Sequence, residues 1–157
     1  MSVASLLASL DERSPAGFAI ALHIRFTAPT FLFQTYPKKW IDIYTDRGLV
    51  LKDPTVHWGF KNTGSIRWRD LIEEDAAGVM RMSGEYGLHY GFTVGINTHG
   101  SRSVSSFARP ERDYLDFEID EISKLLLQLH EQTHGLEALS DADVRALKRM
   151  SIRLTHA

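Results

Sequence analysis

Apolar positions near both ends of the chain repeat with the period of a helix. Residues 2–13 carry one apolar face, formed by Val3, Leu6, Leu7 and Leu10. Residues 111–134 carry a longer stripe, in which apolar positions recur at alternating steps of four and three: Leu115, Ile119, Ile122, Leu126, Leu129, Thr133 and Leu136. We expect both helices to pack through these faces onto the rest of the protein.

Three runs between these helices favour β-structure. The segment GFAIALHIRF (17–26) is rich in apolar and β-branched residues and predicts a strand. GFTVGINT (91–98) and RSVSSFAR (102–109) are separated by His-Gly-Ser, so they predict a hairpin. We interpret TAPTFLFQT (27–35) as a loop that carries aromatic residues.

Four further segments are predicted as helices: residues 37–46, 54 to about 61, 70–87 and 140–150. Pro37 and Pro54 suit the first helical position, and Asp53 and Ser140 are good N-caps. Helices and short strands follow one another without a repeated βαβ order. The chain is therefore expected to be an α+β protein, with helices packed on a small antiparallel sheet.

Composition narrows the classes of protein that the chain can represent. Its 157 residues suit one domain with one substantial core. The formal net charge of -2 gives no long-range attraction for nucleic acid, and the absence of Cys excludes disulfides and thiolate chemistry. No run reaches membrane-spanning length, and the N-terminus lacks the features of a signal peptide. We expect a cytoplasmic protein with no membrane partner.

The segment HEQTHG (130–135) contains His130-Glu131-x-x-His134, the zinc signature of metallopeptidases. Such a site also needs a third protein ligand, and no residue after His134 has a recognisable spacing for that role. Both His lie at the border of the apolar stripe, where one side of an imidazole can face water. We therefore favour the end of a core-packing helix, without a metal, and keep a zinc hydrolase as an alternative.

A second group of residues combines aromatic and acidic side chains. Tyr36, Trp40 and Tyr44 are spaced four residues apart, Asp53-Pro54 follows, and Trp68 comes later. Each feature alone is typical of a core or an N-cap. Together they favour an apolar cavity with two donors, a Tyr O–H and a Trp N–H, and one acidic acceptor. The complementary ligand is small, uncharged and amide-like, with two carbonyl oxygens and one N–H.

This spacing, Y-P-x-x-W-x-x-x-Y, eight residues, D-P, thirteen residues, W, resembles the autoinducer-binding domain of LuxR-type quorum-sensing transcription regulators. The resemblance continues through YGLHYGFTV (86–94) and SVSSFA (103–108), so it covers nearly the whole chain. It implies an N-acyl-homoserine lactone as ligand, no cofactor and no enzymatic activity.

The resemblance also implies roles for individual residues. Trp40 resembles the indole that donates to the lactone carbonyl, Asp53 the carboxylate that accepts the amide N–H, and Tyr36 the phenol that donates to the amide carbonyl. Further positions are similar to the family's pocket walls and minor polar or structural positions: Tyr44 and Trp68 as walls, Ser106 and Thr55 as polar groups, and Gly91 as a structural glycine.

The family fold is an α/β/α sandwich with about five antiparallel strands. The missing strands are expected near 47–52 and 65–69, and the stretch 17–35 is shorter than is usual in the family. Family dimers often pack through terminal helices, so the helices at 2–13 and 111–134 are candidates for a homodimer interface, although the apolar stripe equally suits an intramolecular core.

The resemblance divides the chain at residue 138. Residues 1–138 are expected to be the autoinducer-binding domain, and 139–157 a linker with the truncated beginning of a helix-turn-helix DNA-binding domain. DNA would then be bound only through a C-terminal domain that is not in this chain. We favour the sensor part of a longer regulator. The alternatives are a natural short protein that inhibits a full-length partner, and an interaction module that keeps the fold without a ligand.

Overall fold

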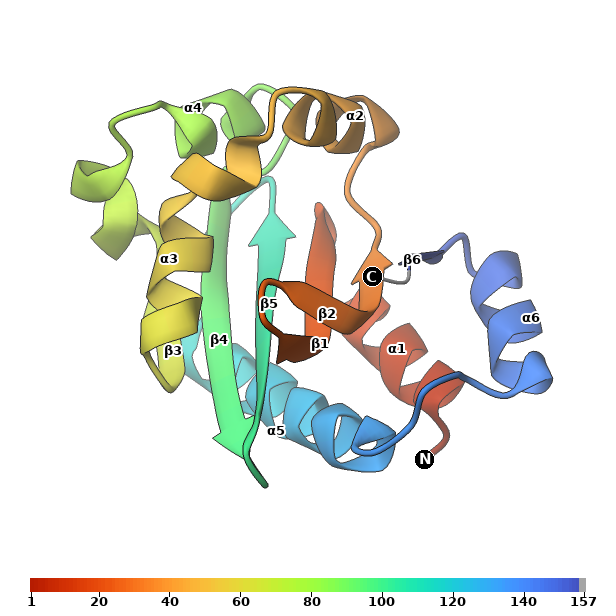
Figure 1. The fold of residues 1–157 in the computed structure, drawn as a ribbon. Helices are drawn as coiled ribbons and strands as arrows, with labels where there is room; N and C mark the ends of the chain where they lie inside the picture. The colour runs from red at the N-terminus through yellow and green to blue at the C-terminus, as the bar shows by residue number, and fades with distance from the viewer. Residues whose placement is uncertain (156–157) are drawn as a thin grey trace.

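Six strands form one antiparallel sheet in the computed structural model, which describes residues 1–155 (Figure 1). They are β1 (Gly17–Arg25), β2 (Ala28–Gln34), β3 (Gly64–Arg67), β4 (Tyr90–Thr98), β5 (Ser101–Arg109) and β6 (Arg153–Thr155), and their order is β3-β4-β5-β1-β2-β6. The hairpins β1–β2 and β4–β5 each close through two residues. In the second hairpin these are His99 and Gly100, both with positive φ, as a tight hairpin turn requires.

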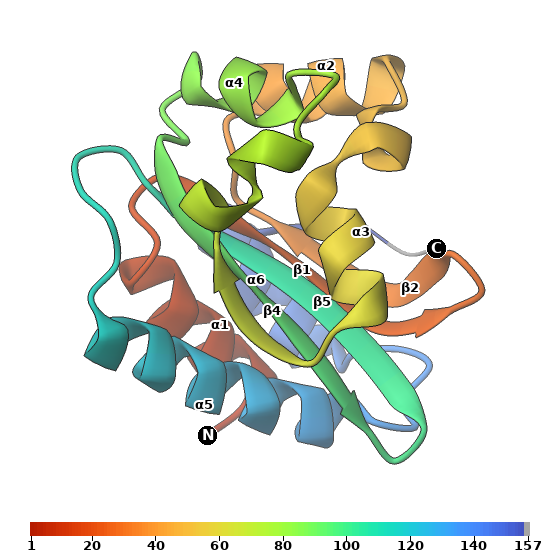
Figure 2. The same cartoon turned by 90° about the vertical axis from the view of Figure 1, so that its left-hand side faces the viewer.

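Helices cover both faces of this sheet (Figures 1 and 2). One face carries α1 (Val3–Glu12) and α5 (Asp116–Thr133). The other carries α2 (Lys38–Asp46), α3 (Pro54–Lys61) and α4 (Val79–Gly84), with the 3₁₀ helices η1 (Leu49–Lys52) and η2 (Trp68–Glu74). The expected α/β/α sandwich is therefore confirmed, with six strands in the described residues where about five were predicted.

The main core lies between the sheet and the pair α1 and α5. The predicted apolar face of α1 is buried, and so are five of the seven positions of the α5 stripe: Ile119, Ile122, Leu126, Leu129 and Thr133. Leu115 and Leu136, at the two ends of the stripe, are exposed because the helix begins after one and ends before the other. The stripe therefore faces an intramolecular core.

Two predictions about strands were wrong. Residues 28–34 form strand β2, not a loop, because Phe31 and Phe33 point into the main core while β2 pairs with β1. Residues 47–52 contain no strand; they end α2 and form η1. The strand expected near 65–69 is present as β3, and β6 was not predicted.

Two helix boundaries also differ from the prediction. The segment 70–87 is not one helix, because Gly78 adopts a left-handed conformation and the Asp75 carboxylate accepts from the N–H groups of Val79 and Met80, which starts α4 afresh. The long helix begins at Asp116, not at residue 111, where Glu118 caps the N–H of Leu115.

The C-terminal segment packs against the same sheet and core. Helix α6 (Asp141–Arg149) lies beside α1, β6 pairs with β2, and Leu147 and Ile152 are buried in the main core. The assignment of 139–157 to the beginning of a second domain stays a prediction, and residues 156–157 lie outside the described residues. None of the helices within residues 1–155 is both long enough and apolar enough to span a membrane.

Candidate functional site

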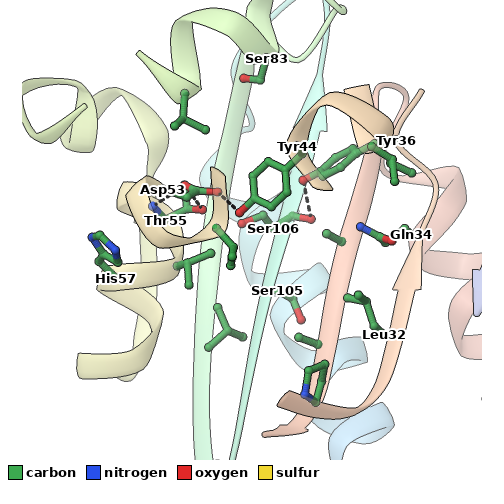
Figure 3. Close-up of a pocket in the computed structure, with 18 of the residues that line it drawn as sticks. Leu32, Gln34, Tyr36, Tyr44, Asp53, Thr55, His57, Ser83, Ser105 and Ser106 are labelled. Atoms are coloured by element: carbon green, nitrogen blue, oxygen red, sulfur yellow. Dashed lines mark hydrogen bonds between the residues drawn. The ribbon is translucent and has the colours of Figure 1, made fainter. Parts of the chain in front are cut away.

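A cavity of about 470 Å³ lies between the sheet and the helices α2, α3 and α4 (Figure 3). Its floor consists of side chains from one face of the strands: Ala19 and Ala21 of β1, Leu32 and Gln34 of β2, and Val104 and Ser106 of β5. Successive side chains of a strand point to opposite faces, so these positions alternate with residues of the main core. The small side chains on β1 leave the space open.

All seven residues that the sequence predicted as a ligand site line this one cavity: Tyr36, Trp40, Tyr44, Asp53, Thr55, Trp68 and Ser106. They come from α2 and the residue before its N-cap, the start of α3, the start of η2, and β5. Segments from residue 36 to residue 106 therefore converge on the same space. Their binding of a ligand stays a prediction.

Asp53 is the acidic group of the site and the N-cap of α3. One carboxylate oxygen accepts from the Thr55 N–H at 2.9 Å and from its hydroxyl at 2.8 Å, and the other accepts from the Tyr44 hydroxyl at 2.7 Å. Burial raises the pKa of the Asp53 carboxyl, while these hydrogen bonds act in the opposite direction. Tyr44, expected only as a wall, therefore also orients the acceptor.

Tyr36 and Ser106 add hydroxyl groups close to this carboxylate. The Tyr36 hydroxyl donates to the carbonyl of Ser106 at 3.3 Å, a long contact that a better acceptor in the cavity can replace. Burial and the Asp53 charge raise the pKa of both Tyr36 and Tyr44, so both phenols stay protonated donors. The Trp68 indole donates to Thr93 at 3.1 Å, and Thr93 shares a hydrogen bond of 2.7 Å with Ser106.

The Trp40 indole N–H is a donor whose ring is fixed by aromatic contacts but which has no acceptor among residues 1–155. Its ring is buried, lies edge-on to Tyr44 at 5.8 Å and stacks on Tyr86 at 5.7 Å. Within residues 1–155, no group accepts a hydrogen bond from its indole N–H. A buried indole N–H normally finds a partner, so this one is available to a ligand in the cavity.

The solvent-exposed part of the cavity lining is largely apolar. It includes Ile24 and Pro29 of the β1–β2 hairpin, Val50 and Leu51 of η1, and Phe60 of α3. Leu51 is 78% exposed and Phe60 38% exposed, so these side chains form a rim at the surface. The cavity thus combines a buried polar group around Asp53 with an apolar rim.

Gly91 permits the wall formed by Trp68. A Cβ at this position would lie 2.5 Å from an indole carbon of Trp68 and 2.7 Å from the carbonyl oxygen of Phe107. The structural role expected for Gly91 is therefore to permit the close approach of the Trp68 indole, at the start of η2, to strand β4.

The HEQTH segment lies on the other face of the sheet, away from this cavity. The prediction that one side of His130 is wet was wrong: His130 is fully buried, and its Nδ1 lies 2.6 Å from the Ser103 hydroxyl. His134 is the C-cap of α5, outside the helix, and Glu131 interacts with His99. No group of three or more His, Asp or Glu side chains within residues 1–155 is arranged to hold a metal ion.

Several cavity residues were not found from the sequence: Ala19, Ala21, Gln34, Ser83 and Val104. The same holds for the roles of Tyr86 and Thr93, which contact the Trp40 ring and the Trp68 indole. Ala19 and Ala21 carry a usable signal, since two small residues alternate with Phe18, Ile20 and Leu22 in one strand. The others have no distinguishing pattern, because single polar or β-branched residues are common in any strand or helix.

The sequence matches one protein-family model, described as the autoinducer binding domain, over residues 19–133. Among similar curated proteins, the transcriptional activator LuxR of Aliivibrio fischeri is 31% identical over 91 residues, covering 54% of this chain and 36% of LuxR. The quorum-sensing regulator RhlR of Pseudomonas aeruginosa is 30% identical over 101 residues, covering 63% of this chain and 42% of RhlR. The chain thus spans less than half the length of these relatives.

Solved structures with the same fold include two regulators. The structure of SdiA in complex with octanoyl-rac-glycerol has a TM-score of 0.62 at 17% identity, and the match covers 96% of this chain and 61% of that chain. The N-acylhomoserine lactone dependent LuxR family factor CepR2 of Burkholderia cenocepacia has a TM-score of 0.58 at 15% identity, covering 86% of this chain and 93% of that chain. At these identities the similarity establishes the fold alone.

Proposed function

Because the chain belongs to the autoinducer-binding domain family of LuxR-type regulators, we propose that its cavity binds an N-acyl-homoserine lactone. The family consists of ligand-binding domains of transcription regulators and not of enzymes, so we discard the zinc hydrolase. The observation that carries the proposal is the arrangement of one buried acceptor, Asp53, among three donors: Tyr36, Trp40 and Ser106.

The amide N–H, the amide carbonyl and the lactone carbonyl of such a ligand each have a complementary group in the cavity. The Asp53 carboxylate accepts the amide N–H, since Tyr44 and Thr55 occupy only part of its acceptor capacity. The Tyr36 hydroxyl exchanges its long bond to the Ser106 carbonyl for the ligand's amide carbonyl. The free Trp40 indole N–H donates to the lactone carbonyl, and the Ser106 hydroxyl supports the amide.

The acyl chain then runs to the apolar rim. Ala19, Ala21, Leu32 and Val104 form the floor along this path, and Leu51 and Phe60 lie at its exit. Contact with these residues removes apolar surface of the chain from water, and each Å² removed contributes roughly 25 cal/mol of favourable free energy to binding. A volume of about 470 Å³ is within the usual range of roughly 300–1,000 Å³ for small-molecule pockets.

We further propose that this domain acts as a homodimer in the cytoplasm and controls DNA binding by a C-terminal helix-turn-helix domain. The curated relatives are transcriptional activators, and this chain corresponds to less than half of their length. Phe117 and Leu127 are exposed on α5 and are available for a dimer contact, since the buried stripe already faces the core. Residues 139–157 would then lead into the second domain.

The test is a thermal-shift titration with N-acyl-homoserine lactones of increasing chain length. A ligand that binds only the folded protein raises its Tm. At a free ligand concentration of 100 times Kd, the free energy of unfolding increases by about 2.7 kcal/mol. Asp53→Ala should abolish most of the shift. Asp53→Asn keeps an N-cap residue but places a donor or a weaker acceptor against the ligand, so it should lose the shift while the ligand-free Tm stays close to that of the wild type.

The matched control is Asp46→Ala, at an exposed position of α2 outside the cavity, which should keep the full shift. A full shift in both Asp53 variants would contradict the role of that carboxylate. If a well-folded wild-type protein binds no lactone, octanoyl-rac-glycerol, which SdiA holds, is the next ligand to titrate. Failure with both ligands would favour the interaction module without a ligand.

A further inference from the structure

The carboxamide of Gln34 is the one polar side chain on the strip of floor formed by β1 and β2. Its neighbours on this face are Ala19, in register with it on β1, and Ala21 and Leu32, which are in register with each other. Within residues 1–155, no group forms a hydrogen bond with this carboxamide. One acceptor and two donors of Gln34 are therefore available at the cavity.

The position of Gln34 places the carboxamide beside the acyl chain. Gln34 is the last residue of β2 and precedes Tyr36 by two residues, and both side chains line the cavity (Figure 3). Two residues of chain span at most roughly 7 Å, and Gln34 is the nearer of the two to Leu32. Tyr36 is the proposed partner of the amide carbonyl, so Gln34 faces the first acyl carbons beyond it.

We propose that Gln34 is a specificity-determining residue that hydrogen-bonds a keto or hydroxyl oxygen on the acyl chain, close to the amide. This inference rests on the proposed function. A keto oxygen accepts from the carboxamide NH₂, and a hydroxyl group both donates to the carboxamide oxygen and accepts from the NH₂. An unsubstituted chain instead covers the carboxamide with methylene groups and removes the water that otherwise satisfies it, which disfavours that ligand.

The test compares three lactones of equal chain length, with no oxygen, a keto group or a hydroxyl group on the third acyl carbon. We expect the wild-type protein to bind one of the oxygenated ligands about tenfold more tightly than the plain one, as one hydrogen bond of ordinary strength allows. Gln34→Met has a similar length and no hydrogen-bonding carboxamide, so it should bind the three ligands with equal affinity and bind the plain chain at least as tightly as the wild type does, because no polar group is left without a partner.

Gln128→Met is the matched control, since Gln128 is exposed on α5 on the far face of the sheet; it should keep the tenfold preference. A side-chain NMR signal of Gln34 that moves with the oxygenated ligands and not with the plain one gives a direct readout. Equal affinities in the wild type, or a preference that survives in Gln34→Met, would overturn the inference while leaving lactone binding intact. If the wild type binds none of the three, the proposed function fails, and this inference fails with it.

Discussion

The two faces of the sheet differ in packing, although the same strands form both: one is filled by the main core and the other lines the cavity. Toward α1 and α5, strand β1 presents Phe18, Ile20 and Leu22, all fully buried in a continuous core. Toward α2, α3 and α4 the same strand presents Ala19 and Ala21, which leave a cavity of about 470 Å³. Residues 18–22 thus alternate between a packed face and an open face, and a register shift between Ala21 and Ile24 reverses this order, so that Ile24 lines the cavity.

Because of this difference in packing, we expect one face to determine stability and the other to determine ligand affinity. Side chains of the packed face fill their space as in an organic crystal, so each lost methylene group is felt. The cavity face lacks that density, so an extra methylene group has room there. Substitutions on one face should therefore change the free energy of unfolding, and substitutions on the other should change affinity for a ligand.

A polar cluster interrupts the packed face near the C-terminal end of α5. The His23 ring on β1 lies 2.6 Å from the Ser101 hydroxyl and 2.9 Å from that of Thr133, and its centroid is 4.5 Å from that of His130. His23 also has a positive φ of 54°, which is uncommon for a residue other than glycine. The packed face therefore contains titratable groups in places where charge is costly.

The largest effect is expected from a truncation on the packed face. Phe107 is fully buried and stacks on Phe92 with ring centroids 5.3 Å apart. Phe107→Ala should lower the free energy of unfolding by about 3–5 kcal/mol, because it removes apolar contacts and leaves a void. Urea denaturation measures this loss. Ile72→Ala, at an exposed position of η2 outside the cavity, is the control and should cost less than about 0.5 kcal/mol.

The next largest effect is a loss of stability in acid that arises from the polar cluster. Burial, followed by the neighbouring His130, lowers the pKa of His23 to about 4, and burial also lowers the pKa of His130. His99, Glu131 and His134 surround these two rings. Below pH 6.5 the unfolded chain takes up protons that the folded protein refuses until about pH 4. The free energy of unfolding should therefore fall as the pH falls through this window.

At about 1.4 kcal/mol per pKa unit, the fall of the His23 pKa from 6.5 to about 4 sets an upper bound of roughly 3.5 kcal/mol on its contribution to this decline. His23→Asn suits the positive φ and does not titrate, so its stability should depend less steeply on pH between 6.5 and 4. His89→Asn, at an exposed position, should leave the slope unchanged. Equal slopes for the wild type and His23→Asn would place the acid sensitivity in other groups. Denaturation curves at a series of pH values measure these slopes.

The same comparison explains which elements could be predicted from the sequence. Helices α1 and α5 face the packed core with one side and solvent with the other, so their sequences show a clear helical period. Strand β2 faces the core with Phe31 and Phe33 and the apolar cavity with Leu32, so both sides are apolar and the strand alternation disappears. The aromatic run was therefore interpreted as a loop.

The error at 47–52 has a related cause. The apolar run Leu49-Val50-Leu51 suggests a strand, yet Val50 and Leu51 lie at the rim of the cavity in η1. Their apolar character fits contact with a ligand rather than with another strand. In contrast, the polar end of the cavity was predictable because six anchor residues keep a fixed spacing. The spacing could not reveal that Tyr44 bonds Asp53, since this depends on how η1 returns the chain from α2 to α3.

The smallest effect on stability is expected on the cavity floor, where the effect on binding is large. Ala21→Leu places three additional carbons in the cavity beside Leu32 and Val104, its register partners on β2 and β5. The free energy of unfolding should change by less than about 1 kcal/mol, because a void is available for the larger side chain. The same carbons occupy the proposed path of the acyl chain, so the ligand-induced rise in Tm should be lost.

Ala142→Leu, at an exposed position of α6, is the matched control and should leave both the stability and the ligand-induced shift unchanged. Two results would break the separation between the faces. A loss of stability for Ala21→Leu as large as that for Phe107→Ala would mean that the cavity face is packed as tightly as the core. A normal ligand shift in Ala21→Leu would mean that the acyl chain leaves the polar end by another path. If neither occurs, the alternation of residues 18–22 of β1 separates a face that sets stability from a face that is free to adapt to the proposed ligand.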